Sequence, residues 1–196
     1  MVCKKCAIKP VIILPNSNIK LCSSCFTKYF EKKVYRTIRQ YKLINKKDSI
    51  AVALSGGKDS LSLLYVLNKL ATTQKDLALI AILIDEGIHG YRELTIKDAK
   101  AFCKKHKIDL KIYSYEQEFG YSLDKLLKKI KLNACTTCGV LRRYLLNKYA
   151  RKLKVTKLAT AHNLDDEAQA ILMNLFRNNV EISARLGPLT GIVKDE

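Results

Sequence analysis

The chain has 196 residues, and its 36 lysines and arginines against 18 aspartates and glutamates give a formal net charge of +18. This length supports one domain of about 150 residues plus a small satellite. No apolar run approaches the roughly 20 residues of a membrane helix, and Cys3 and Lys4 stand where a signal peptide would have its apolar core, so we expect no membrane span and a cytoplasmic location. The charge makes nucleic acid the first partner to consider, although a lysine-rich surface alone would give the same count.

Two Cys-x-x-Cys pairs open the chain, with fifteen residues between them: Cys3 and Cys6, then Cys22 and Cys25. This spacing is typical of a four-thiolate zinc site. Residues 11–14 and 19–21 suit the two strands of a short hairpin. We therefore predict a zinc ribbon over residues 1–27 that serves folding and RNA docking. A rubredoxin-like iron site or a redox pair is the alternative.

A basic amphipathic helix is predicted next, because apolar residues recur at helical spacing among lysines and arginines over 26–44. We assign residues 28–48 to a basic linker helix. Its charged face could contact an RNA backbone or simply be solvated.

A short glycine loop follows the apolar strand predicted at 50–54 and precedes a helix that begins at Leu61. Glycines let a main chain approach a ligand closely, and the N–H groups that open a helix attract anions. The spacing is not that of a Walker A loop. We predict a phosphate-binding loop whose glycines can take backbone angles closed to other residues; an ordinary glycine turn into an Asp-capped helix is the alternative. The loop residues are Ser55, Gly56, Gly57, Lys58, Asp59 and Ser60.

Further strands are predicted at 77–84, 110–113 and 155–160, alternating with helices at 91–105, 121–130 and 140–154 and a last helix that runs to about Asn178. The eight consecutive apolar residues at 77–84 are typical of a central parallel strand. This alternation predicts an α/β fold with a doubly wound, mostly parallel sheet over residues 49–196. Ligands of such sheets lie beyond the carboxyl ends of the strands, where Asp85 falls.

Two more groups of chemically active residues lie downstream. Cys135 and Cys138 open the predicted helix at 140–154 beside Arg142, where thiolates are expected to have lowered pKa values. Buried structural thiols, or half of another zinc site, are the alternatives. Asp165 and Asp166 follow the last strand, where they could hold Mg2+ or orient a substrate, or could cap the next helix.

The order of these motifs, SGGKDS at 55–60, IDEGIHGYR at 84–92, CTTCGVLRR at 135–143 and AHNLDDEAQ at 161–169, together with the ribbon, resembles the tRNA 2-thiolation enzymes of the PP-loop ATP-pyrophosphatase superfamily. These are the cytoplasmic and archaeal 2-thiouridine synthetases, which are related to the 2-thiocytidine synthetases. The resemblance implies an adenine nucleotide α-hydrolase-like fold. It also implies an ATP-dependent transferase that adenylates the C2 oxygen of a tRNA uridine, releases pyrophosphate and then displaces AMP with sulfur.

The resemblance also implies residue roles. The glycine loop binds ATP, with Lys58 offsetting phosphate charge. Ile84 and Asp85 meet the adenosine, and Gly139 and Asp165 belong to the cofactor site. Cys135 and Cys138 match thiolates that hold a [4Fe-4S] cluster. Asp165 and Asp166 lie near ATP and the target base, and Arg142 helps to place the activated intermediate.

The implied partners are tRNA, a sulfur donor that is a ubiquitin-like thiocarboxylated protein or sulfide, and a second copy in a homodimer. Members of this family continue beyond the point that corresponds to Glu196, with a third cluster cysteine and a second ribbon. The chain is thus expected to be a fragment, to be completed by a partner, or to be shortened. Two other functions stay open: a zinc-ribbon tRNA-binding module with an incomplete active site, and another PP-loop ligase.

Overall fold

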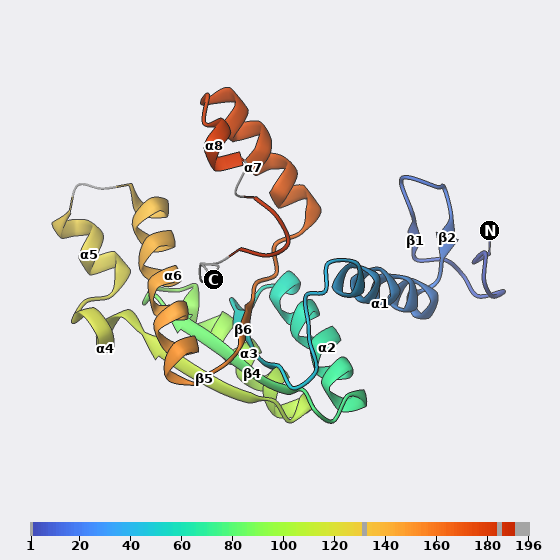
Figure 1. Ribbon diagram of the computed structural model, residues 1–196, viewed down its shortest axis with the longest axis horizontal. Coiled ribbons are helices and arrows are strands. Elements are labelled where there is room, and N and C mark those ends of the chain that lie inside the picture. Colours follow the sequence, from blue (N-terminus) through green and yellow to red (C-terminus); the bar gives the residue numbers. More distant parts are fainter. Residues whose placement is uncertain (1, 131–132, 184–185, 191–196) are drawn as a thin grey trace, which may run out of the picture. The chain divides into compact units, whose positions relative to one another are not determined.

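The computed structural model of the chain describes residues 2–130, 133–183 and 186–190 (Figure 1). The residues group into two compact units, one formed by Met1–Asn45 with Pro188–Glu196 and the other by Lys46–Gly187. The predicted domain boundaries at 27 and 48 stay a prediction. None of the helices within the described residues is both long and apolar enough to cross a bilayer.

The smaller unit contains a two-stranded hairpin and one helix. Strand β1 (Ile12–Ile13) pairs antiparallel with β2 (Lys20–Leu21), and Ile12 lies opposite Leu21. The turn closes where the Asn18 N–H donates to the Leu14 carbonyl at 2.9 Å. Helix α1 (Ser23–Gln40) follows directly, so it begins and ends earlier than the helix predicted at 26–44. Leu14 and Leu21 pack with Cys3 and Cys22 into a small core.

The larger unit is built on a four-stranded parallel sheet in the order β5-β4-β3-β6. Its strands are β3 (Ser49–Leu54), β4 (Ala78–Asp85), β5 (Asp109–Ser114) and β6 (Lys157–Ala159). The chain moves outward from β3 to β5 and then returns to the other side of β3 for β6 (Figure 1). This reversal places a topological switch point between β3 and β6, and confirms the predicted α/β fold.

Helices cover both faces of this sheet. On one face, Ala51 and Ile82 pack against Leu145 and Tyr149 of α6 (Ala134–Lys152), and against α4 (Tyr115–Phe119) and α5 (Leu123–Lys129). Successive strand residues point to opposite faces. The buried alternate positions, such as Val52 and Leu83, therefore face α2 (Lys58–Thr73) and α3 (Arg92–His106), which contact β3, β4 and β5.

Helices α4 and α8 (Val180–Ser183) were not predicted, and α6, like α1 and α2, begins earlier than expected. Helix α4 is a single turn with a capping box in which Ser114 accepts from the Gln117 N–H. Helix α8 follows α7 (Leu164–Phe176). Helix α6 begins at Ala134, ahead of the predicted Val140, because Asn133 caps it by accepting from the Thr136 N–H at 3.1 Å.

Candidate active site

The glycine loop lies at the carboxyl end of the central strand β3 and leads into α2. Ser60, which is buried, holds it closed: its hydroxyl accepts from the Ser55 N–H at 3.2 Å and donates to the Gly57 carbonyl at 3.0 Å. The Ser55 hydroxyl in turn accepts from the Gly57 N–H at 3.3 Å. Lys58 begins α2 with its side chain 87% exposed and an ion pair to Asp59 at 2.9 Å. The loop thus presents to solvent a helix N-terminus and an exposed ammonium group that is paired with Asp59.

The two glycines of the loop have different roles. Gly56 has φ +84°, and a Cβ placed there would lie 2.6 Å from the Thr95 carbonyl oxygen. Only glycine fits this close approach to α3. Gly57 instead has φ −79° and ψ 163°, angles that any residue adopts. Gly57 therefore does not use the conformational freedom of glycine, and it serves as the N-cap of α2.

Replacing Gly56 with alanine should destabilise the protein more than the same change at Gly120, a glycine with φ +74° and nothing within 4 Å of a Cβ. Both variants strain the backbone by about 1–2 kcal/mol, whereas only Gly56→Ala also overpacks, which typically adds about 1–3 kcal/mol. Thermal melts of the two variants measure the difference. Equal melting temperatures would show that α3 yields freely and that the contact with Thr95 does not hold the loop.

The carboxyl end of β4 is tied to the glycine loop by Arg92, the first residue of α3. Its side chain, 6% exposed, donates through Nη1 to the Ser55 carbonyl at 2.8 Å and through Nη2 to the Ile84 carbonyl. Its Nε lies 2.8 Å from Glu86 Oε2. The Glu86 carboxylate is also buried, and its Oε1 lies 3.6 Å from Arg142 Nη1 on α6. Arg92 and Glu86 stand in the motif at 84–92, but sequence reasoning gave neither a role.

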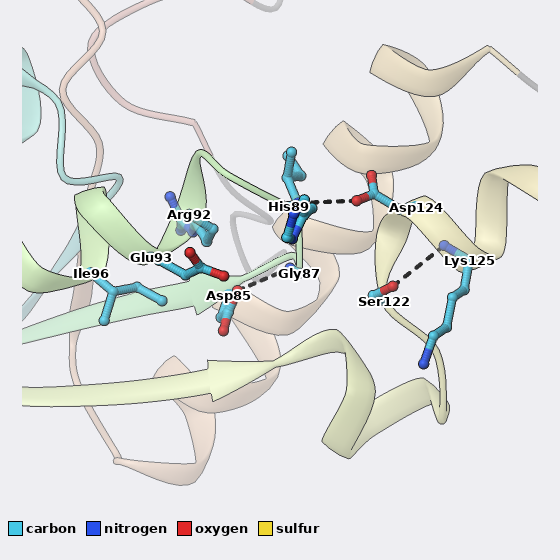
Figure 2. A pocket seen from close by; sticks show the side chains of 10 residues that line it. Asp85, Gly87, His89, Arg92, Glu93, Ile96, Ser122, Asp124 and Lys125 are labelled. Carbon is cyan, nitrogen blue, oxygen red and sulfur yellow. Dashed lines mark hydrogen bonds between the residues drawn. The ribbon is translucent and has the colours of Figure 1, made fainter.

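A pocket of about 350 Å³ opens beyond the same strand end. Asp85 lines it and accepts from the Gly87 N–H at 2.9 Å (Figure 2). Arg92, Glu93 and Ile96 contribute from the start of α3, and Ser122, Asp124 and Lys125 from the start of α5. Ile84 differs from Asp85, because its side chain packs in the core and only its main chain borders the strand end.

Cys135 and Cys138 lie in the first turns of α6, rather than before the helix as predicted. Cys135 is exposed and Cys138 is half-buried. The hydroxyl of Tyr115, a fully buried residue, donates to the Cys138 carbonyl at 2.9 Å and lies 3.9 Å from its sulfur. Burial raises the pKa of Tyr115, and the nearby Cys138 thiol raises it further, so the hydroxyl stays a donor. Gly139 follows within the helix, and Arg142 lies one turn beyond Cys138 on the same face.

Asp165 and Asp166 lie in the first turn of α7, beyond the end of β6. Asn163 is the N-cap and accepts from both aspartate N–H groups, and the Asp166 carboxylate accepts from the Asn163 N–H at 2.8 Å. Asp166 therefore completes a capping box, which is the helix-capping role that the sequence offered as the alternative for this residue. Both side chains are exposed.

The sheet gathers these groups at one edge. Parallel pairing of β6, β3 and β4 sets the glycine loop, the Asp85 loop and the Asp165 turn at adjacent carboxyl ends. The buried Glu86 carboxylate pairs with Arg92 of α3 and with the half-exposed Arg142 of α6, so the helix that carries Cys138 lies at the same place. Such an edge, next to a switch point, is where ligands of open α/β sheets bind.

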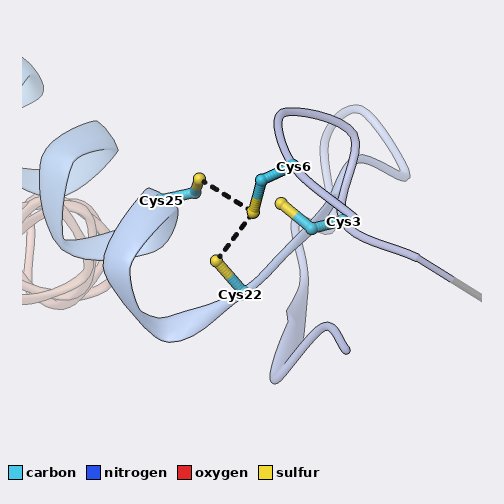
Figure 3. Close-up of side chains that lie close together, drawn as sticks. All are labelled: Cys3, Cys6, Cys22 and Cys25. Atoms are coloured by element: carbon cyan, nitrogen blue, oxygen red, sulfur yellow. Dashed lines mark hydrogen bonds between the residues drawn. The ribbon is translucent and has the colours of Figure 1, made fainter. Parts of the chain in front are cut away.

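The four remaining predicted ligands lie together in the smaller unit. The sulfurs of Cys3, Cys6, Cys22 and Cys25 all lie within 4.8 Å of one another (Figure 3). Cys6 Sγ is 3.4 Å from Cys22 Sγ and 3.7 Å from Cys25 Sγ. Four sulfurs about 2.3 Å from one tetrahedral Zn2+ would be separated by similar distances. The cluster thus fits a structural zinc ion.

The thiols of this cluster differ in pKa. Burial acts to raise the pKa of Cys3, but N–H donors that include those of Cys22 and Lys5 lower it to about 6. The hydrogen bond with Cys22 raises the pKa of Cys25 to about 12. Without a cation, thiols this close cannot all ionise; a divalent ion would remove that conflict.

Comparisons with known proteins place this architecture in a family. The model of the PP-loop domain matches residues 27–188, and the chain belongs to that family. It is 42% identical over 177 residues to the "Probable sulfurtransferase" of Methanocaldococcus jannaschii. This match covers 87% of this chain and 52% of that protein. It is 38% identical over 194 residues to the zebrafish (Danio rerio) cytoplasmic tRNA 2-thiolation protein 1, covering 97% of this chain and 55% of that protein.

Among solved structures, the chain is similar to the U34-tRNA thiolase NcsA from Methanococcus maripaludis, which was determined with its [4Fe-4S] cluster. The TM-score is 0.85 at 36% sequence identity, over 99% of this chain and 64% of that one. The chain spans about half the length of the curated relatives it matches.

Proposed function

We propose that this chain takes part in ATP-dependent 2-thiolation of a tRNA uridine, as a tRNA sulfurtransferase that converts ATP to AMP and pyrophosphate. The observation that carries the proposal is that a predicted phosphate-binding loop and a pair of cysteines lie at the same edge of the sheet. The glycine loop at the end of β3 and the cysteine-bearing start of α6 are joined through the buried Glu86. Relatives named for tRNA thiolation support the same conclusion.

The first half of the proposed reaction is adenylation. The C2 oxygen of the uridine attacks the α-phosphorus of ATP, the bond from the α-phosphorus to the bridging oxygen breaks, and pyrophosphate leaves. The N–H groups at the start of α2 and the ammonium of Lys58 bind the phosphates and offset the charge that develops there. Asp85 and the main chain of Ile84 border the adenosine, and the pocket beside Asp85 offers concave space at that position.

Carboxylates beside the phosphates complete this half. Asp165 and Asp166 offer the oxygen ligands that Mg2+ prefers. Both side chains are exposed at the edge of the sheet. Asp166 would have to exchange its bond to the Asn163 N–H for a role at the base or the ion.

The second half is sulfur transfer, in which sulfur attacks C2 and AMP departs. Cys135 and Cys138 would bring sulfur to the activated base, and Arg142, 48% exposed, would neutralise the departing phosphate. A [4Fe-4S] cluster takes cysteine thiolates as ligands, and when bound it would supply an iron site that carries sulfur. In the described residues α6 offers two such thiolates, while the other cysteines lie in the ribbon or buried in α3. The fit is therefore partial.

The remaining parts of the proposal concern partners and metal. The ribbon cysteines would hold a structural Zn2+. The net charge of +18 suits tRNA as the partner. Sulfide or a thiocarboxylated ubiquitin-like protein would donate the sulfur in the cytoplasm, and a homodimer would be the working form.

Replacing Cys138 with serine tests the division into two halves. Because Cys138 lies on α6 and outside the glycine loop, tRNA-dependent pyrophosphate release should change by less than about twofold, while 2-thiouridine formation falls at least about tenfold. Nucleoside mass spectrometry and a pyrophosphate assay on the same samples measure both. Cys103→Ser, a change at a buried cysteine of α3, is the matched control.

Two outcomes would contradict the proposal. Thiolation that persists in Cys138→Ser would place the sulfur-bearing group elsewhere. Absence of any tRNA-dependent pyrophosphate release in the unmodified chain would reject the adenylation half and favour a tRNA-binding module.

A further inference from the structure

A buried carboxylate between two arginines links the two halves of the candidate site. Glu86 and Arg92 have side chains 3% and 6% exposed, and Arg142, 48% exposed, completes the set. Charged groups are rarely so buried unless they are paired. These ion pairs lie at the carboxyl edge of the sheet, between the glycine loop and α6, so they are placed to connect the two.

Arg92 fixes the position of the glycine loop. Its two terminal nitrogens donate to carbonyls at the ends of two neighbouring strands, Ser55 at the end of β3 and Ile84 in β4. Ser55 immediately precedes Gly56, where an added Cβ would lie 2.6 Å from the carbonyl oxygen of Thr95 in α3. The Thr95 hydroxyl donates to the Arg92 carbonyl at 2.9 Å. The first turn of α3 is thus a rigid support for the loop that would hold the phosphates.

Glu86 carries this support across to α6. One carboxylate oxygen lies 2.8 Å from Arg92 Nε and the other lies 3.6 Å from Arg142 Nη1. Arg142 follows Cys138 by one helical turn. The buried Tyr115 hydroxyl donates to the Cys138 carbonyl at 2.9 Å. Glu86 thus pairs with an arginine on the same stretch of α6 that carries Cys138.

We propose that Glu86 is a positioning residue that aligns Arg142 and the cysteine helix with the phosphate loop, so that adenylation and sulfur transfer occur on the same base without a rearrangement between them. The inference rests on the proposed function and deepens it. Glu86 touches no substrate in this scheme; it acts through Arg92 on the loop and through Arg142 on α6.

Two variants distinguish the contact of Glu86 with Arg92 from its contact with Arg142. We call the two contacts together the Glu86 bridge. Glu86→Gln keeps the shape but leaves Arg92 without a counter-charge, so it risks the fold. Glu86→Asp keeps the charge beside Arg92, while the loss of one methylene withdraws the carboxylate from Arg142, already 3.6 Å away. Glu118→Gln is the matched control, because Glu118 of α4 pairs with Lys148 and Tyr149 on the same helix α6 but not with the loop.

The activity measurement follows tRNA-dependent pyrophosphate release and thiolation at varied ATP. In Glu86→Asp we expect kcat for thiolation to fall at least about tenfold, since small misplacements of reacting groups cost this much, with the KM for ATP changed less than about threefold. Because Glu86 acts through Arg142, adding Glu86→Asp to Arg142→Met should lower kcat no further than Arg142→Met alone. A kcat at the wild-type value, or losses that multiply in the double variant, would overturn the proposal.

A second measurement does not depend on catalysis. Hydrogen exchange followed by mass spectrometry should show faster exchange in both segments 55–60 and 134–142 in Glu86→Gln, and in the second segment alone in Glu86→Asp, which keeps the pair with Arg92. Neither segment should change in Glu118→Gln, because the partners of Glu118 lie at 148–149. Unchanged exchange at 134–142 in Glu86→Asp, or at 55–60 in Glu86→Gln, would overturn the proposal. If the unmodified chain releases no pyrophosphate, the proposed function fails, while the exchange result still decides whether Glu86 couples the two segments.

Discussion

Lys58→Ala should lower tRNA-dependent pyrophosphate release by at least about 100-fold, the size of effect seen when a group that stabilises transition-state charge is removed. The Lys58 side chain is 87% exposed and pairs with the adjacent Asp59, so it supports no packing. Its ammonium would lie beside the phosphates, where charge develops as pyrophosphate leaves. The melting temperature should therefore stay within about 2 °C of the wild-type value, because surface substitutions of this kind change stability by less than about 0.5 kcal/mol.

A matched variant makes that result specific. Lys97→Ala removes another exposed lysine, on α3, and should leave pyrophosphate release unchanged. Lys58→Arg retains the charge but changes the geometry of the donors, so it should recover only part of the rate. Wild-type rates in Lys58→Ala would remove the lysine from the mechanism and leave the loop as an ordinary glycine turn.

Cys22→Ser should abolish the zinc binding proposed for the ribbon and unfold the ribbon. Cys22 is 3% exposed and is both a member of the thiol cluster and the N-cap of α1. In zinc-finger peptides, metal binding supplies about 10–16 kcal/mol that appears as folding free energy, and the loss of one ligand forfeits much of it. Metal analysis should find about one zinc fewer per chain, and residues 3–25 should lose protection from hydrogen exchange.

The rest of the molecule provides the internal comparison for that experiment. Strands β3 and β4 should keep their protection in Cys22→Ser, because they belong to the other compact unit. Cys103→Ser, which alters a buried thiol of α3, should keep its zinc. A full zinc equivalent in Cys22→Ser, or unchanged protection of the hairpin, would contradict a zinc-dependent ribbon.

Local patterns in the sequence predict much of this structure. The eight apolar residues at 77–84 identify β4 because a central strand is covered on both faces. The two Cys-x-x-Cys pairs identify the ribbon because ligand spacing is a local property. The beginning of α6 was misplaced, since the capping role of Asn133 is easily confused with a loop. Helix α4 is only one turn long, too short for helical periodicity to show.

The Glu86 bridge could not be derived in the same way. Glu86, Arg92 and Arg142 are scattered over more than fifty residues of an arginine- and lysine-rich chain. Pairing among such residues is decided only when α3 and α6 pack at one end of the sheet. Gly56 shows the same limit: its positive φ is suggested by the residue type, but the close approach of Thr95 is a tertiary contact.

The spacing of the ribbon thiols also makes them prone to oxidation when no metal is bound. Cys6 and Cys22 hold their sulfurs 3.4 Å apart, so a small movement would bring them to the roughly 2.05 Å of a disulfide. A bound metal ion would occupy all four sulfurs and shield them from peroxide. Metal-depleted protein stored in air should therefore become about 2 Da lighter for each bond formed and stop accepting zinc until a reductant is added. In this unit, a bound metal ion would therefore also protect the four thiols from oxidation.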